Sequence, residues 1–133
     1  IQGYAALFGV ADLSGDIVRM GAFRHSLVSR KASLPMLVQH ERKALAGHWS
    51  DVREDARGLF VQGEIDETQP GARHAMRFIQ RGYDGLSIGF ITLAAHQSAR
   101  GRVLEDIELL EVSLVSLPMQ PLARLSRVQS LHA

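Results

Sequence analysis

The pattern of hydrophobic and polar positions predicts mostly β structure. Apolar runs of strand length recur along the chain, separated by short connections that are polar or contain glycine. The runs expected to form extended structure are 4–8, 17–18, 34–40, 45–52, 59–65, 85–93 and 103–117. The connection 53–58 is polar and ends in glycine, which predicts that the strands on either side of it form a hairpin.

Two segments favour helices. Residues 21–28 resemble a short helix, and residues 70–81 carry a clearer signal. The apolar positions of the second segment recur at i, i+3, i+4 and i+7, as on one face of a helix: Ala72, Ala75, Met76 and Ile79. Thr68 is expected to cap this helix and Gly82 to end it.

These elements show no alternation of strand and helix, so a parallel βαβ architecture is not expected. The pattern instead predicts a mostly β protein with peripheral helices, built as an antiparallel barrel or sandwich of six to seven strands. A chain of 133 residues with 46% hydrophobic content can bury one core, which predicts a single domain over 1–133. Because the sequence begins at Ile1 within a strand-like pattern, we expect that the natural chain has been truncated or processed at both ends.

Composition narrows the possible partners and chemistries. The formal net charge is +1, from 15 basic and 14 acidic residues, so no strong field favours nucleic acid or a membrane surface. The chain has no cysteine, which excludes disulfides, thiol nucleophiles and thiolate metal sites. No apolar run reaches the roughly 20 residues that span a bilayer, and the N-terminus lacks a signal pattern. We therefore expect a soluble intracellular domain without nucleic-acid or membrane partners.

One serine stands in a motif that suggests catalysis. The stretch YDGLSIGF (83–90) contains G-x-S-x-G, which in α/β-hydrolases places a nucleophilic serine on a turn from strand to helix. Here the residues after Ser87 are apolar and favour a strand, so that interpretation is rejected. With period two, Leu86, Ile88 and Phe90 would face the core, and Ser87 would share the other face with Gly85 and Gly89. The two glycines would leave Ser87 open to a peptide, although small residues packed beneath a crossing element would give the same pattern.

A serine nucleophile needs a base and an acid that orients the base. Two of the six histidines, His40 and His48, lie beside predicted strands, and the chemistry of the residues favours His40 only modestly. For the acid, period two in 107–117 places Glu111 on one face, together with Leu109, Ser113 and Val115. Glu108 falls on the other face, and spacing alone does not decide between the two glutamates.

Five sequence blocks together resemble those of the prohead proteases of tailed phages. The blocks are GYAALF (3–8), DIV with GAF (16–18 and 21–23), LVQHE (37–41), DGLSIGF (84–90) and LLEVSLV (109–115). The resemblance covers nearly the whole chain, with the blocks in the family's order. That family is similar in fold to the herpesvirus assemblins, which are β-barrels wrapped by helices.

The resemblance implies a serine endopeptidase of capsid maturation that removes scaffolding segments inside the prohead and then digests itself. It implies that Ser87 is the nucleophile, that His40 is the general base and then acid, and that Glu111 orients His40. Residues near Met119 and Gln120 would supply backbone amides to an oxyanion hole. The sequence departs from its relatives at two points: a glutamate stands where assemblins have a second histidine, and SLPMQP (116–121) stands where a TFPANP-like run is common.

The resemblance also implies the partners and the place of action. The partners would be the major capsid protein or its scaffolding segment and further copies of this chain in a homo-oligomer, inside the immature capsid in the bacterial cytoplasm. No cofactor or metal is expected, because the single pair His40-Glu41 does not form the H-E-x-x-H motif of a metallohydrolase. The main alternative is a catalytically silent capsid-assembly module with the same fold.

Overall fold

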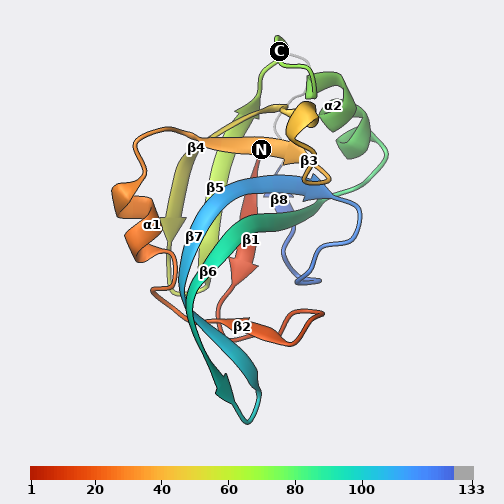
Figure 1. Cartoon of the computed structure of the whole chain (residues 1–133). Helices are drawn as coiled ribbons and strands as arrows, with labels where there is room; N and C mark the ends of the chain where they lie inside the picture. The colour runs from red at the N-terminus through yellow and green to blue at the C-terminus, as the bar shows by residue number, and fades with distance from the viewer. Residues whose placement is uncertain (128–133) are drawn as a thin grey trace.

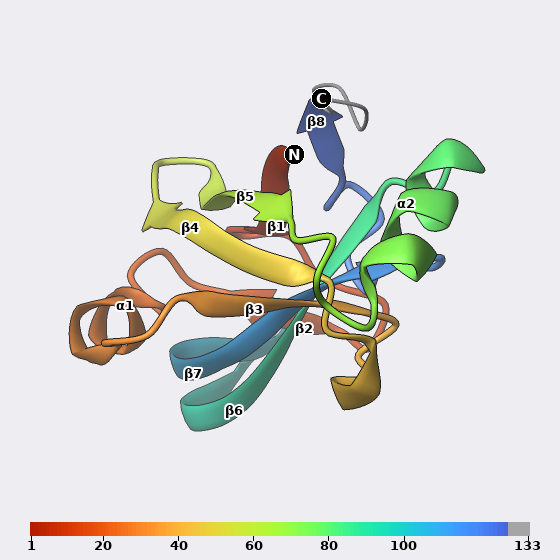
Figure 2. The ribbon, with the colours of Figure 1, turned by 90° about the horizontal axis from the view of Figure 1, so that it is seen from above.

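The computed structural model describes residues 1–127, which form eight strands, two α-helices and one 3-10 turn. The strands are β1 (Gln2–Leu7), β2 (Asp16–Val18), β3 (Leu34–Val38), β4 (Gly47–Glu54), β5 (Gly58–Ile65), β6 (Gly85–Ser98), β7 (Gly101–Val115) and β8 (Leu125–Arg127). The helices are α1 (Arg24–Ser29) and α2 (Ala72–Gln80), and the 3-10 turn η1 spans Arg42–Ala44. The expectation of a mostly β protein with peripheral helices is confirmed, and Figures 1 and 2 show α1 and α2 at opposite sides of the sheet.

The sheet is mixed and open, so the prediction of an antiparallel barrel with six to seven strands is wrong. The strand order is β2-β7-β3-β4-β5-β1-β8, and β6 pairs with β7 beside this path (Figure 1). β7 runs parallel to β2 and β3 and antiparallel to β6. Within the described residues, isolated bridges rather than ladders connect the ends of the sheet: Phe8, just after β1, pairs with Val18 of β2, and Gly85 of β6 pairs with Arg124, just before β8. Pairing between strands so distant in the sequence leaves no local signal, which is why the pattern did not predict it.

Predictions of single elements and of the hairpin agree with the structure better than the prediction of the sheet's overall arrangement. The hairpin is confirmed as β4 and β5, with a register shift between Trp49 and Asp51. Helix α2 is confirmed, and Gly82 follows its end with a φ of 91°, a conformation that glycine adopts without the steric cost of a Cβ. Thr68 does not cap the helix: the N-cap is Gly71, and the Thr68 hydroxyl donates to the Asp66 carboxylate at 2.6 Å.

Two other predicted elements differ in extent. β6 extends beyond the predicted end at 93 to Ser98, and β7 begins at Gly101 rather than 103, so the two strands form a long hairpin that projects from the body in Figure 1. Helix α1 begins at Arg24 rather than 21, since Gly21 has a φ of 91° that a helix does not accommodate. Within residues 1–127 no helix has both the length and the apolar character needed to cross a membrane.

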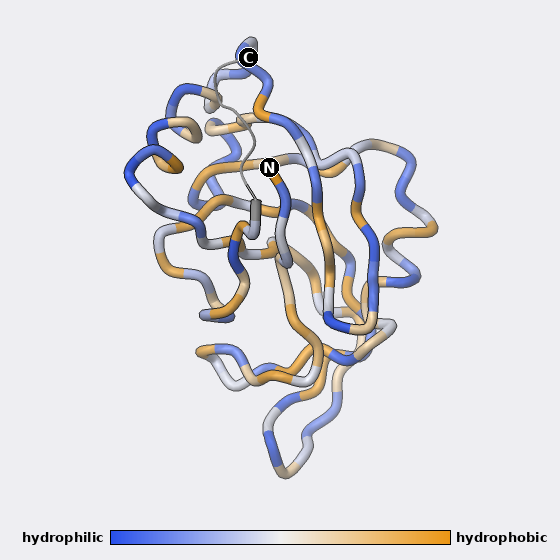
Figure 3. The backbone as a smooth tube through the Cα atoms, turned by 180° about the vertical axis from the view of Figure 1, so that it is seen from behind, coloured by the Kyte–Doolittle hydropathy of each residue, from blue (hydrophilic) through white to orange (hydrophobic). Residues whose placement is uncertain are grey.

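The core lies between the curved sheet and its helices. Its largest fully buried side chains include Trp49, Phe23, Met36, Leu86 and Leu114. The Trp49 indole N–H donates to the carbonyl of Val112 on β7 at 3.0 Å, which satisfies its polar atom within the core. Figure 3 shows hydrophobic stretches along the central strands and hydrophilic ones in peripheral connections. The Trp49 hydrogen bond ties β4 to β7 through the core.

Candidate active site

Ser87 lies on β6, and the apolar residues expected on its core face are buried to different degrees: Leu86 fully, Ile88 and Phe90 only in part. Leu86 is fully buried in the core, whereas Ser87 is 8% exposed and its neighbours Gly85 and Gly89 add no side chain on that face. In the antiparallel register with β7, Ser87 stands opposite Ser113. The hydroxyl of Ser87 is thus presented beside the polar face of β7.

His40 sits on a two-residue turn directly after β3. Gln39 and His40 both have positive φ, 54° and 60°, and the N–H of Glu41 donates to the carbonyl of Val38 at 3.1 Å. This is the φ pattern of a type I′ turn, which glycine and asparagine usually form, so each side chain here costs about 1–2 kcal/mol. β7 holds the turn: the His40 N–H donates to Ser113 Oγ at 3.1 Å, and the Gln39 N–H donates to a β7 carbonyl at 2.8 Å.

Glu111 on β7 binds the imidazole of His40. Its Oε2 lies 2.6 Å from His40 Nδ1, and its Oε1 accepts a hydrogen bond from Ser113 Oγ at 2.8 Å. The hydrogen bond with Glu111 raises the pKa of His40 above its ordinary value, against the opposing effect of desolvation. Because an ionised carboxylate can only accept, Nδ1 carries the proton and Nε2 of neutral His40 is left as a base.

A β-bulge decides between the two candidate glutamates. Gly89 pairs with Glu111 while the next β6 residue, Phe90, pairs with Leu109, so Leu110 is an extra residue in β7. Leu109 is therefore buried in the core, which corrects the expectation that it shares a face with Glu111. Glu108 is exposed on the far side of the bulge, and only Glu111 reaches His40.

Gly89 makes room for the carboxylate of Glu111. A Cβ built on Gly89 would lie 2.6 Å from Glu111 Cδ and would overlap the carboxylate oxygen Oε2. That oxygen is the one bound to His40. Gly89, the second glycine of the G-x-S-x-G stretch, therefore gives space to the Glu111 carboxylate as well as to Ser87. The spacing of residues along one strand did not reveal this role.

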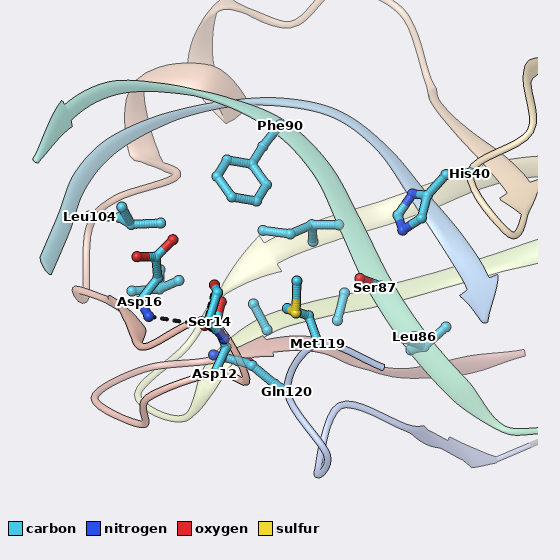
Figure 4. Close-up of a pocket in the computed structure, with 14 residues that line it drawn as sticks. Asp12, Ser14, Asp16, His40, Leu86, Ser87, Phe90, Leu104, Met119 and Gln120 are labelled. Atoms are coloured by element: carbon cyan, nitrogen blue, oxygen red, sulfur yellow. Dashed lines mark hydrogen bonds between the residues drawn. The ribbon is translucent and has the colours of Figure 1, made fainter. Parts of the chain in front are cut away.

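Ser87 and His40 line one cavity of about 290 Å³. Figure 4 shows the His40 ring and Ser87 at one end of this cavity, with Phe90, Leu104 and Asp16 toward the other end. His48 lies on β4 and lines a separate hollow, so it is not brought to Ser87. Among residues 1–127 no three His, Cys, Asp or Glu side chains gather as metal ligands.

The segment after β7 closes another side of the cavity with Met119 and Gln120. Within the described part of the chain, the backbone N–H groups of these two residues donate to no protein acceptor. The Gln120 side chain is buried and binds both peptide groups of Leu7, accepting from its N–H and donating to its carbonyl at 3.0 Å. Sequence reasoning missed this clamp, which ties the segment to β1.

Comparisons with known proteins agree with this architecture. Residues 1–132 match the family described as Caudovirus prohead serine protease. The prohead protease of Enterobacteria phage HK97 is 30% identical over 134 residues, covering 97% of this chain and 60% of that protein, so this chain spans about 60% of that relative's length.

Two solved structures share the fold at low sequence identity. The bacteriophage T4 capsid assembly protease gp21 superposes with a TM-score of 0.66 at 15% identity, over 86% of this chain and 80% of that one. The KSHV protease, solved with a hexapeptide phosphonate inhibitor, has a TM-score of 0.62 at 16% identity, over 90% of this chain and 60% of that one.

Proposed function

Because the chain belongs to the Caudovirus prohead serine protease family, we propose that it is a serine endopeptidase that cleaves capsid-protein or scaffold segments during prohead maturation, and also itself. The observation that carries the proposal is the convergence of three separate elements. Ser87 from β6 and His40 from the turn after β3 line one cavity, and Glu111 from β7 binds the far side of the imidazole.

In the first half of the proposed reaction, Ser87 Oγ attacks the carbonyl carbon of the scissile peptide bond. His40 Nε2 takes the hydroxyl proton, and Glu111 holds Nδ1–H and stabilises the imidazolium that forms. The C–N bond then breaks as His40 returns the proton to the departing amine. The product of this half is an ester between Ser87 and the acyl part of the substrate.

The second half repeats the same proton transfers with water. His40 removes a proton from a water molecule that attacks the ester, and the proton passes to Ser87 Oγ as the acid is released. In both halves the carbonyl oxygen becomes an oxyanion. The backbone N–H groups of Met119 and Gln120 at the cavity wall, which have no acceptor among residues 1–127, are our candidates to stabilise it.

The proposed partners follow from the family and not from the cavity. They are the major capsid protein or its scaffolding segment, met inside the immature capsid in the host cytoplasm. The similar T4 protein is named a capsid assembly protease, which supports this setting. Self-association into a homo-oligomer is also proposed, because a protease confined in a prohead is present at high local concentration.

The test is co-expression of the full-length protein with its major capsid or scaffold protein. Wild type is compared with Ser87→Ala, and Ser50→Ala serves as the matched control because Ser50 is an exposed serine on β4. Intact mass spectrometry should find a defined fragment with wild type and Ser50→Ala and none with Ser87→Ala.

Other outcomes have definite meanings. Cleavage by folded Ser87→Ala would show that the nucleophile is assigned wrongly. Absence of cleavage by wild type, with binding to the capsid protein retained, would favour the catalytically silent assembly module instead.

A further inference from the structure

Ser113 is a fully buried polar side chain that touches two members of the proposed triad. It is 0% exposed on β7, between the core residues Val112 and Leu114, and stands opposite Ser87 in the sheet. Its hydroxyl accepts from the His40 N–H at 3.1 Å and donates to Glu111 Oε1 at 2.8 Å. With the contact between Glu111 Oε2 and His40 Nδ1, these hydrogen bonds close a ring.

The direction of each hydrogen bond in the ring is determined by chemistry. A backbone N–H can only donate, so the Ser113 oxygen accepts from His40, and a carboxylate can only accept, so the Ser113 proton goes to Glu111. Both carboxylate oxygens are then occupied, one by Ser113 and one by the imidazole. This matters because the terminal torsion of glutamate is broad, and Gly89, whose missing side chain makes room for the carboxylate, has no side chain to hold it in one orientation.

We propose that Ser113 is a positioning residue that sets the orientation of Glu111 and, through Glu111 and the backbone of His40, the orientation of the imidazole toward Ser87. The inference rests on the proposed serine protease function. One hydroxyl anchors both the strained turn that carries His40 and the carboxylate that holds its ring, so the two move as a unit. A substitution that removes this hydroxyl leaves Glu111 free to rotate away from Nδ1.

A purely structural role would consist only of satisfying the His40 N–H in the turn. Ser26 provides the matched control for this role, since it is also buried and its hydroxyl accepts from a β7 backbone N–H, that of Leu109, at 2.9 Å. Ser26→Ala therefore leaves the Leu109 N–H on β7 unpaired, but it removes no hydrogen bond to His40 or Glu111. It should reduce stability without changing the reactivity of Ser87.

The deciding comparison is between Ser113→Thr and Ser113→Val in the full-length protein. The two side chains have the same shape, so any strain from the added methyl group in the buried site is common to both, and only the hydroxyl differs. The assay is the second-order rate at which a fluorophosphonate probe modifies Ser87, followed by intact mass, and Ser87→Ala gives the background. No knowledge of the natural substrate is required.

We expect Ser113→Val and Ser113→Ala to label roughly 10- to 100-fold more slowly than wild type, the loss that a displacement of about 1 Å produces at a catalytic group. Ser113→Thr should recover most of the rate. In proton NMR, the downfield signal of His40 Nδ1–H bound to a carboxylate should persist in Ser113→Thr and disappear in Ser113→Val. Equal labelling rates and equal NMR signals in the two variants would overturn the role of Ser113.

Failure of the proposed function gives a different result. In that case folded wild type is not modified at Ser87, while the NMR comparison still reports whether Ser113 orients the pair of His40 and Glu111. A Ser26→Ala protein that labels as slowly as Ser113→Val would show that loss of stability explains the effect, and would also overturn the inference.

Discussion

Replacement of Gly89 with alanine tests the geometry of the site with a single methyl group. Gly89 does not have a positive φ, so alanine fits its backbone, and the three atoms nearest to the added Cβ all belong to the side chain of Glu111. The distance from this Cβ to Glu111 Cδ would be 2.6 Å, whereas ordinary contact begins at 3.4 Å, so the carboxylate must move by about 0.8 Å. The 2.6 Å contact between Oε2 and His40 Nδ1 cannot survive such a displacement unchanged.

The expected result is a large loss of reactivity with little loss of stability. A shift approaching 1 Å in a catalytic group costs up to about 100-fold, so the rate of Ser87 phosphonylation should fall roughly 10- to 100-fold. The free energy of unfolding should change by no more than about 1 kcal/mol, because glycine to alanine at a compatible backbone stabilises through the unfolded chain and offsets part of the strain. Labelling kinetics and urea denaturation measure the two quantities on the same sample.

A control variant and a double mutant test whether the effect of Gly89→Ala acts through Glu111. Gly82→Ala places a methyl group in open space at a φ of 91°, so it should cost about 1–2 kcal/mol of stability and leave labelling unchanged. In a Glu111→Ala background there is no carboxylate to displace, so Gly89→Ala should add no further loss. The reasoning is refuted if Gly89→Ala labels at the wild-type rate, or if its full effect remains without Glu111.

Three further predictions concern the same region. Glu111→Gln replaces the carboxylate whose hydrogen bond and, to a smaller extent, charge raise the pKa of His40, so this pKa should fall in an NMR titration. The stability that protonated His40 contributes is present below its unfolded-state pKa and lost as the pH rises through the folded-state pKa, and this decline should flatten in the variant. An unchanged titration would contradict this. Gln120→Leu leaves the buried N–H and carbonyl of Leu7 unpaired and should lower the free energy of unfolding by about 2–4 kcal/mol in urea, and a loss under about 0.5 kcal/mol would refute the clamp. Trp49→Phe removes an indole hydrogen bond to a β7 carbonyl and should cost about 1–3 kcal/mol by thermal denaturation, whereas unchanged stability would show that the bond contributes nothing.

Predictions from the sequence succeeded where the signal lies within one element. The apolar residues around Ser87 located β6 and placed Leu86 in the core, and the spacing of Ala72, Ala75 and Ile79 located α2. The same logic failed on β7, because one bulged residue, Leu110, reverses the alternation on one side of it. A bulge depends on how many residues the partner strand offers, and the strand's own sequence does not record that number.

By itself, the sequence determined the chemistry that is available and the local elements that carry it. It supplied a serine with a glycine two residues away on either side, a histidine after a strand and an acid within an apolar strand, together with a resemblance to the proteases of phage proheads. The tertiary structure alone decided that β3 lies parallel to β7, that Gln39 and His40 adopt left-handed backbone conformations, and that Glu111 rather than Glu108 reaches the imidazole. The physical reason is distance along the chain: His40 and Glu111 are 71 residues apart, and hydrogen bonds across such separations depend on strand pairing that no local pattern encodes.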